Sequence, residues 1–445
     1  MTVPSGAGVR PSFAEAFGVF ARIGLLSFGG PAGQIALMHR LLVDEKKWLD
    51  EARFLHALNY CMLLPGPEAM QLATYAGWLL HGVRGGLMAG LLFVLPGALV
   101  LTLLSSLYLL LGEVGIVQGL LFGLKAAVLA VVLEALVKVS KRALKSRQMI
   151  VVAVLAFVAI AFLRLPFPLI IALAALIGVA LHLAGEGGRR SSPGVEVMQG
   201  DMPDWTRPNL GRFVSTLAIW LTLWFGPLLL LHALLGPQHV YAKEASFFSV
   251  MAAVTFGGAY AVLAWVAQQA VEVYQWLRPD EMLTGLGLAE TTPGPLILVL
   301  VFVGFLGGAR QSGLEPLTGG LAGAAVTLWF TFVPCFLWIF VGAPYVETVR
   351  NIAWLSTALT AVTAAVVGII ANLALWFGLH VLFATVGEAR LGPFALPVPD
   401  LASFDPWAAL IAVAAGAALL RYHVNMIAVL TAAAAAGMVL RLTVG

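Results

Sequence analysis

The chain contains the same short motifs twice, in the same order and at one spacing. The sequence SFGG at 27–30 recurs as TFGG at 255–258, and PGP at 65–67 recurs at 293–295, both at an offset of 228 residues (255 − 27 and 293 − 65). A Trp-Leu pair between these motifs recurs in the same register. Anchors that share one spacing indicate a duplicated unit. In an apolar chain, matched glycine and proline interruptions are typical of transporters that bind substrate between repeats near the bilayer midplane.

The composition places the chain in a membrane. Hydrophobic residues make up 61% of the 445 residues and charged residues 11%, whereas soluble domains have about 45–50% apolar and about 25% charged residues. One spanning helix needs about 20 apolar residues, so there is room for roughly a dozen membrane segments. The apolar stretches are rich in Ala, Leu and Val without strict alternation, which predicts helices rather than the strands of a barrel. The expected fold class is an all-α polytopic membrane protein.

Several classes of function find no support in the sequence. The two cysteines, Cys61 and Cys335, do not have CxxC spacing, so we expect buried thiols and no disulfide, zinc site or redox pair. A net charge of +3 gives no support for a nucleic-acid partner. Because HExxH, haem-ligand and GxGxxG patterns are missing from the sequence, a membrane enzyme is disfavoured and no cofactor or metal is expected. The start, MTVPSGAGVRPSF, lacks the features of a signal peptide, so the first helices should direct insertion.

The chain divides into four parts. Residues 186–211 form the long polar stretch of the sequence, rich in Gly, Pro, Ser and Arg, and this composition predicts a linker. We therefore expect a first transporter repeat at 1–185, a cytoplasmic linker at 186–211, a connecting transmembrane helix at 212–245 and a second repeat at 246–445.

The distribution of Lys and Arg predicts that the two repeats are inverted. Basic residues concentrate in the loop 138–147 and in the linker, and short basic loops favour the cytoplasm. The loop 39–53 carries four basic residues, while its second-half counterpart near 271–281 carries Arg278 alone. Equivalent loops should therefore face opposite sides of the membrane. A single crossing by the helix at 213–235 would produce inverted-topology repeats related by a pseudo-two-fold axis in the membrane plane.

The Gly/Pro-broken segments are predicted to be re-entrant half-helices. If the loop 39–53 and the N-terminus are both cytoplasmic, the segment 13–38 must enter the membrane and return, bending at its glycines. The segment 52–81 should bend at its PGP motif in the same way. Broken backbone at membrane depth is tolerated where it lines a cavity or is buried in protein. The alternative is a set of kinks whose backbone groups are satisfied by neighbouring helices.

The motifs resemble a known family. SFGGPAGQI at 27–35 and LLPGPEAMQLATYAGW at 63–78, with weaker copies at 255–263 and 291–305, resemble the chromate ion transporters in their long form of two homologous halves. The resemblance spans nearly the whole chain. It implies a multi-pass protein of the cytoplasmic (inner) membrane that exports chromate and confers chromate resistance. It further implies that chromate is handled as a sulfate-like divalent oxyanion, with transport coupled to protons. Membrane lipid is an expected partner, and a homodimer is a candidate assembly.

The second half departs from the first at several polar positions, so the first half is expected to hold the polar contacts to substrate. The pairs at equivalent positions are Pro31 and Ala259, Gln34 and Val262, Glu68 and Leu296, and Gln71 and Val299.

Helix starts and glycines can supply the donors that a tetrahedral dianion needs. The first backbone N–H groups of a helix are free, and the helix dipole places partial positive charge there. Glycines at these places let the backbone approach a ligand, and proline fits the first turn of a half-helix. The amides of Gln34 and Gln71 can also donate, although each could instead bridge helices. From both repeats, the expected substrate-binding residues at the breaks are Ser27, Phe28, Gly29, Gly30, Gln34, Pro65, Gly66, Gln71, Gly257, Gly258 and Gly294.

Two cations inside apolar runs are further candidates for substrate binding. Arg22 lies in the first run and is replaced by Val250 at the equivalent position; a cation at membrane depth is a functional candidate, and the alternative is that it snorkels to the surface. Lys125 lies inside a later helix. Its alternative role is a structural ion pair with Glu134, although nine residues (134 − 125) separate the two by about 13 Å along a helix.

Two carboxylates are the expected proton-coupling residues. Glu68 follows Pro67 directly, and Glu290 precedes the second PGP motif in apolar surroundings. A desolvated carboxylate can carry a proton. Glu68 has an alternative role, because an acidic residue in the first turn of a helix also complements the helix dipole.

Three other interpretations remain beside chromate export. A general oxyanion or sulfate transporter would use the same donors, because chromate and sulfate differ little in shape and charge. A passive anion channel can also be built from inverted repeats with half-helices. A membrane-bound chromate reductase is the enzyme alternative, and consumption of chromate with an electron donor would support it.

Overall fold

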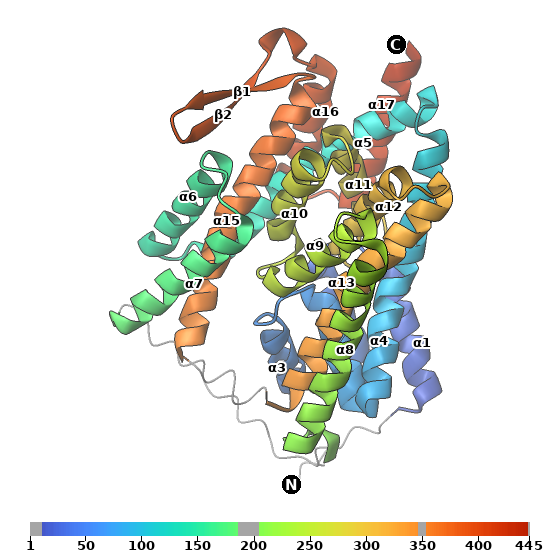
Figure 1. Cartoon of the computed structure of the whole chain (residues 1–445), viewed down its shortest axis with the longest axis vertical. Coiled ribbons are helices and arrows are strands. Elements are labelled where there is room, and N and C mark those ends of the chain that lie inside the picture. Colours follow the sequence, from blue (N-terminus) through green and yellow to red (C-terminus); the bar gives the residue numbers. More distant parts are fainter. Residues whose placement is uncertain (1–10, 186–203, 346–352, 444–445) are drawn as a thin grey trace.

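The computed structural model describes residues 11–185, 204–345 and 353–443. Apart from one β-hairpin, its regular elements are helices (Figure 1). The first half contains α1 (Phe13–Leu26), α2 (Gly30–His39), α3 (Glu51–Cys61), α4 (Glu68–Leu111), α5 (Gly115–Ala143), α6 (Arg147–Ala161) and α7 (Phe167–Leu183). A π-helical turn, Arg40–Glu45, continues α2.

The second half follows the same order after one extra helix. It contains α8 (Leu210–Leu235), α9 (Val240–Val254), α10 (Ala259–Gln268), α11 (Pro279–Glu290), α12 (Val299–Gln311), α13 (Pro316–Gly342), α15 (Ala353–Leu382), α16 (Pro406–Gly416) and α17 (Met426–Thr443). A 3₁₀ turn, Leu296–Leu298, leads into α12.

The predicted fold class, an all-α polytopic membrane protein, is confirmed. In the part of the chain that the structure describes, 6 helices are long and apolar enough to cross a membrane, and α6, α7 and α16 with its extension are shorter apolar helices. The helices run mostly along the long axis of the molecule, with α1 beginning at one end and α17 ending at the other (Figure 1). The thiols of Cys61 and Cys335 are free and buried.

The helices are interrupted at the predicted motifs. α1 ends before Ser27 and α2 begins at Gly30, where Gly29 has a φ of 84° and Gly30 of 74°. The PGP glycines have φ values of 123° at Gly66 and 97° at Gly294. These conformations suit glycine because it has no side chain to clash with the preceding backbone. The long helix α4 leaves helical geometry once more at Gly82, where φ is 61°, so that a short half-helix precedes its long span.

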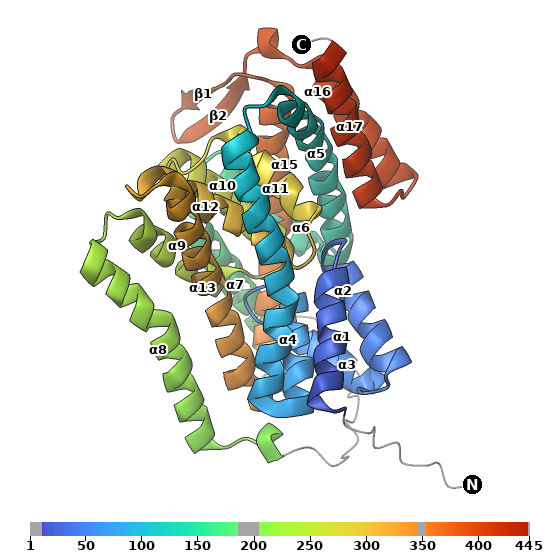
Figure 2. The ribbon, with the colours of Figure 1, turned by 90° about the vertical axis from the view of Figure 1, so that its right-hand side faces the viewer.

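Helix α8 lies at the edge of the bundle. It begins at the lower end of the molecule and ends beside the start of α9 (Figure 2). In its most apolar stretch only 11% of the residues are buried, as expected for a helix that faces lipid on most sides. Among the described residues between the two halves, α8 is thus long and apolar enough to cross a membrane. The inversion of the two repeats across a membrane stays a prediction.

Several predicted boundaries differ from the structure. Helix α8 begins at Leu210, inside the predicted linker, and α9 begins at Val240, before the predicted start of the second repeat at 246. Most of the predicted linker, 186–203, lies outside the described residues. The β-hairpin of β1 (Val386–Leu391) and β2 (Phe394–Pro399) was not predicted. It covers the upper end of the bundle beyond α15 (Figure 1).

Candidate functional site

The four interruptions meet as two crossed pairs in the middle of the protein. We call the segments 27–29, 62–67, 255–258 and 291–295 the crossed loops. The N–H of Gly66 donates to the carbonyl of Thr255 over 2.7 Å, and the N–H of Gly294 donates to the carbonyl of Ser27 over 2.8 Å. The two donor glycines are 228 residues apart (294 − 66), and so are the two acceptor residues (255 − 27). The PGP glycine of each half is thus bonded to the FGG motif of the other half by the same contact.

Hydroxyl groups hold the accepting carbonyls in place. Ser27 Oγ donates to the carbonyl of Ile23 at 2.6 Å, and Thr255 Oγ1 donates to the carbonyl of Met251 at 2.5 Å. Each hydroxyl satisfies an orphan carbonyl at the end of its own helix. The two hydroxyls bond within their own helices, α1 and α9. The backbone carbonyls of Ser27 and Thr255 instead accept from the PGP glycines of the opposite half.

Gln34 adds a side-chain link to the pair of loops that contains Ser27 and Gly294. Its Nε2 donates to the carbonyl of Gly294 at 2.6 Å and reaches the carbonyl of Ser27 at 3.3 Å. Gln71 acts within its own half, where Nε2 donates to the carbonyl of Pro65 at 2.8 Å. Both side chains are buried, and their Oε1 atoms have no partner among the described residues. These amides therefore leave two buried acceptors beside the loops, which a water or a protonated ligand can satisfy.

Helix N-termini and open space adjoin the crossed loops. Helix α2 begins after Gly29, α10 after Gly258, and α4 after Pro67, so three sets of free N–H groups start here. A Cβ placed on Gly29, Gly30 or Gly258 would meet no atom within 4 Å. The backbone at these glycines therefore borders open space.

The other predicted residues at the breaks fill structural places. Gly257 packs on Val366 of α15, since a Cβ there would lie 3.1 Å from that side chain. Pro65 accepts the hydrogen bond from Gln71. Phe28 is half-buried, and its N–H donates to the carbonyl of Leu26. These three residues shape the loops, while their contact with substrate stays a prediction.

Glu290 ends α11 beside the crossed loops. Its carboxylate is buried and accepts a hydrogen bond from the hydroxyl of Tyr260, in the first turn of α10. The charges of Glu134 and Lys138 on α5 act on this carboxylate, and the two residues form an ion pair at 2.7 Å. A carboxylate with one hydroxyl partner and a nearby ion pair can exchange a proton as its surroundings change.

Glu68 lies near the same helix. It is the first residue of α4, and the charge of Arg142 acts on its carboxylate. Residues 134, 138 and 142 are four apart, so their side chains project from one face of α5. Both predicted proton-coupling carboxylates thus lie within the electrostatic influence of one charged stripe on α5.

The two predicted cations lie elsewhere. Arg22 forms an ion pair of 3.9 Å with Glu45, and 56% of its side chain is exposed. Lys125 lies 3.7 Å from Asp280 in a cavity at the far end of α11. The alternative pairing of Lys125 with Glu134 is wrong, because Glu134 pairs with Lys138 one turn further along α5. Neither Arg22 nor Lys125 has a polar contact to the crossed loops among the described residues.

Sequence analysis missed three polar residues. Tyr260 lies two residues after the second FGG motif, and this proximity was the available signal. Glu244 was detectable as a carboxylate at the start of an apolar run; it is fully buried, and neither carboxylate oxygen has a partner in the described chain. Glu281 is almost fully buried and is held by Arg310 at 2.6 Å. The described residues include no group of three or more His, Cys, Asp or Glu able to hold a metal ion.

A family model described as chromate transporter matches residues 14–179 and 243–438. The chain belongs to the chromate transporter family. The family match includes all four crossed loops and excludes α8. The family resemblance drawn from the sequence motifs is therefore confirmed.

Two relatives named as chromate transport proteins cover most of this chromate transporter family member, and a third covers a quarter of it. A chromate transport protein of Pseudomonas aeruginosa is 31% identical over 366 residues, which are 81% of this chain and 79% of the relative. A probable chromate transport protein of Synechococcus elongatus is 28% identical over 361 residues, or 79% of this chain and 81% of the relative. The uncharacterized transporter YwrB of Bacillus subtilis is 36% identical over 112 residues, 25% of this chain and 56% of YwrB. No solved structure matches the chain.

Proposed function

We propose that this protein exports chromate from the cytoplasm across the cytoplasmic membrane and uses the crossed loops as its substrate site. The observation that carries the proposal is the reciprocal pair of hydrogen bonds, Gly66 to Thr255 and Gly294 to Ser27. These bonds assemble helix N-termini from both halves around open space at Gly29 and Gly258. A tetrahedral dianion suits such a place, because free N–H groups and helix dipoles stabilise negative charge. Relatives named as chromate transport proteins support the choice of oxyanion.

Inverted repeats would give this site alternating access. The contacts at the crossing are equivalent in the two halves, and α8 supplies one extra crossing between them. Rocking of one repeat against the other would then expose the site to each side in turn. The basic loops assign the cytoplasmic side to the C-terminal end of α5.

Proton movement is the proposed driving force. Glu290 with Tyr260, and Glu68 near Arg142, adjoin the crossed loops and share the charged stripe of α5. For the pH gradient to drive export, protons must move inward while the anion moves outward. A carboxylate that is protonated from the exit side after the anion has left would carry its proton inward and lose it on the cytoplasmic side, which couples the two movements. Arg22 remains a proposed attractor of the anion at the protein surface.

Transport into inside-out vesicles tests this function. Vesicles with an acidic interior should accumulate radiolabelled chromate above its equilibrium level, and collapse of the pH gradient should abolish the accumulation. Flux that only equilibrates would instead favour a passive channel. Flux of sulfate without chromate would favour a general oxyanion transporter, and consumption of chromate with an electron donor would favour an enzyme.

A further inference from the structure

A cavity lies at the other end of α11 from the crossed loops. It has a volume of about 480 Å³ and is bounded by α5, α11 and α17, with the start of α16 at its rim. Asp280 near the start of α11 lines it, while Glu290 at the end of α11 adjoins the crossed loops. Ten residues of helix (290 − 280) separate the two by about 15 Å. The cavity is therefore distinct from the crossed loops.

We propose that this cavity is an exit-side binding site for the transported divalent oxyanion, in which Lys125 and Arg441 bind the anion and Asp280 is the internal carboxylate that it displaces. The inference rests on the proposed export function, and it adds a second site to it. We call this cavity, lined by Lys125, Asp280 and Arg441, the exit pocket.

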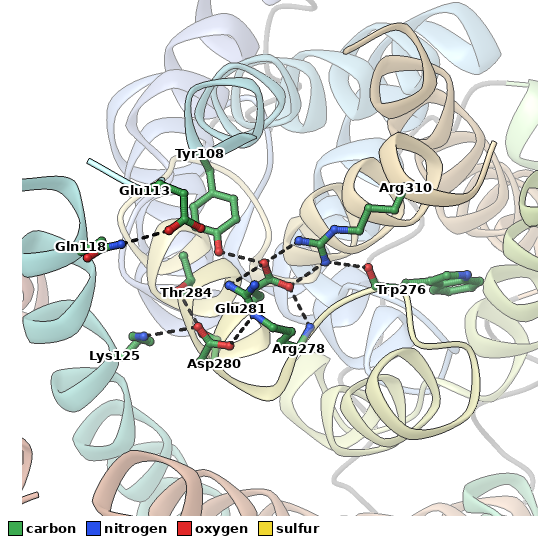
Figure 3. A network of polar contacts seen from close by, with 10 residues as sticks. All are labelled: Tyr108, Glu113, Gln118, Lys125, Trp276, Arg278, Asp280, Glu281, Thr284 and Arg310. Atoms are coloured by element: carbon green, nitrogen blue, oxygen red, sulfur yellow. Dashed lines mark hydrogen bonds and ion pairs between the residues drawn. The ribbon is translucent and has the colours of Figure 1, made fainter. Parts of the chain in front are cut away.

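Lys125 is held loosely in the exit pocket. Its Nζ lies 3.7 Å from Asp280 Oδ2, which exceeds the 2.7–3.2 Å of a hydrogen bond from nitrogen to oxygen. Figure 3 shows the ammonium group pointing from α5 toward this carboxylate. About a quarter of the side chain, 24%, is exposed. An incoming dianion can thus reach donors that Asp280 does not fully use.

Arg441 adds a second cation without an acidic partner. It reaches the exit pocket from the last turn of α17, and no carboxylate pairs with it in the part of the chain that the structure describes. An arginine guanidinium can bind two oxygens of an oxyanion at once. Lys125 and Arg441 therefore provide two positive charges on different helices around one space.

The other charged groups around the exit pocket already have partners. Asp405 caps α16 by accepting from the N–H groups of Trp407 and Ala408, both at 2.9 Å. Glu113 accepts a hydrogen bond from the side chain of Gln118 at 3.2 Å. Arg278 pairs with Asp280 at 3.3 Å, so Asp280 keeps a partner when an anion takes Lys125.

The neighbouring carboxylate on α11, Glu281, forms a tight ion pair with which the contact of Lys125 can be compared. Glu281 is bound by both guanidinium nitrogens of Arg310, at 2.6 and 2.7 Å, and by Tyr108 at 3.0 Å (Figure 3). Its burial and two-point contact fix the start of α11. The single long contact between Lys125 and Asp280 has neither property, which suits a pair that opens during transport.

Close packing of α5 and α11 separates the exit pocket from the crossed loops along α11. Gly287 of α11 packs against Leu124 of α5 so closely that a Cβ on the glycine would lie 2.6 Å from Leu124 Cγ. This contact lies between the exit pocket and Glu290 along α11. The pocket also lies toward the N-terminal end of α5, whereas the basic loop that predicts the cytoplasmic side follows the C-terminal end. On that prediction, the pocket belongs to the exit side.

Competition by sulfate from the exit side tests the pocket. Inside-out vesicles are loaded with increasing sulfate, and the lumenal concentration that halves chromate uptake is measured for each variant. Lys125→Gln should raise this concentration about tenfold, since it removes one charge-assisted contact. Asp280→Asn should lower it several-fold, and Lys125→Arg should stay near the wild-type value. Arg421→Gln, which removes an exposed cation at the other end of the α16–α17 hairpin, is the matched control.

Two results would overturn the exit pocket while export stands. Unchanged sulfate competition in both Lys125→Gln and Asp280→Asn would overturn it, and so would an equal change in Arg421→Gln. If Lys125→Gln fails to fold, the nearly isosteric Asp280→Asn carries the test.

If no vesicles take up chromate, the export function fails separately. Binding of radiolabelled sulfate to the purified full chain then decides the pocket: weaker binding in Lys125→Gln and tighter binding in Asp280→Asn support it, and equal binding contradicts it.

Discussion

The backbone N–H of Gly66 donates a hydrogen bond to the carbonyl oxygen of Thr255, 2.7 Å away in the other half of the chain. The equivalent bond from Gly294 to Ser27 repeats the contact in the opposite sense. The centre of the protein is therefore assembled from both copies of the duplicated unit, and neither half can complete it alone. A substitution in either PGP motif should therefore disturb the structure of both halves.

The first prediction concerns the space around Gly66. Gly66→Ala should lower the thermal stability of the purified protein and reduce chromate uptake. Its φ of 123° costs an alanine on the order of 1–3 kcal/mol, and the added Cβ would lie 2.9 Å from Gln71 Nε2 and 3.0 Å from Cys335 Sγ. Gly30→Ala is the control, because its φ is also positive but its Cβ would meet open space. Equal melting temperatures for the two variants would contradict the packing argument.

The second prediction concerns the bridge made by Gln34. Gln34→Val places the residue found at the equivalent position 262 into the first half. It removes the hydrogen bonds to Gly294 and Ser27, a loss of about 1–3 kcal/mol for buried partners. We expect chromate uptake to fall by at least about tenfold, with a lower melting temperature.

Gln71→Val is the matched control for this bridge. It makes the same chemical change, but Gln71 bonds only within its own half, to Pro65. We therefore expect a smaller loss of uptake than in Gln34→Val. Equal losses in the two variants would show that the link between the halves is not what Gln34 contributes.

The interruptions of the helices could be predicted from sequence because glycine and proline act locally. Gly29, Gly66 and Gly294 all adopt positive φ values, which is a local preference of glycine. The offset of 228 residues added a second signal, because each motif occurs in both halves. The pairing of the loops could not be predicted in this way. The bond from Gly66 to Thr255 depends on how the two halves pack, and no local pattern encodes that arrangement.

Side-chain partners were predictable only along one helix. For Lys125 the sequence offered Glu134 on α5 as a partner, whereas the structure pairs it with Asp280 on α11. The hydrogen bond from Tyr260 to Glu290 could not be predicted, because it depends on how α10 packs against α11. The β-hairpin escaped prediction because its second strand, Phe394–Pro399, contains prolines, which argue against strands.

The third prediction is a pH dependence at His39, the last residue of α2. A hydrogen bond with Glu51, together with the charge of Asp44, raises the pKa of His39 above its usual value of 6.5. Because the folded value is raised, the stabilisation is fully present below about pH 6.5. It is lost as the pH rises through the raised value.

A variant of His39 checks this dependence. His39→Gln should cost less than about 1 kcal/mol, since the pair is partly exposed, and melting temperatures at pH 6 and pH 8.5 measure it. The difference between wild type and variant should be larger at pH 6. A difference that grows toward pH 8.5 would contradict the proposed charge pairing.

The last prediction concerns proton coupling at Glu290. Glu290→Gln removes the titratable group that accepts from Tyr260, so chromate uptake should no longer respond to the pH gradient, although downhill flux persists. Tyr260→Phe removes only the hydroxyl, and we expect coupling to remain with a shifted pH profile. Glu272→Gln is the control, because this carboxylate lies in the π-helical turn Gln269–Val273 that continues α10 and pairs with Arg164 at 3.2 Å. Full gradient-driven accumulation in Glu290→Gln would remove Glu290 from the proton path and leave Glu68, beside the same stripe of α5, to carry it.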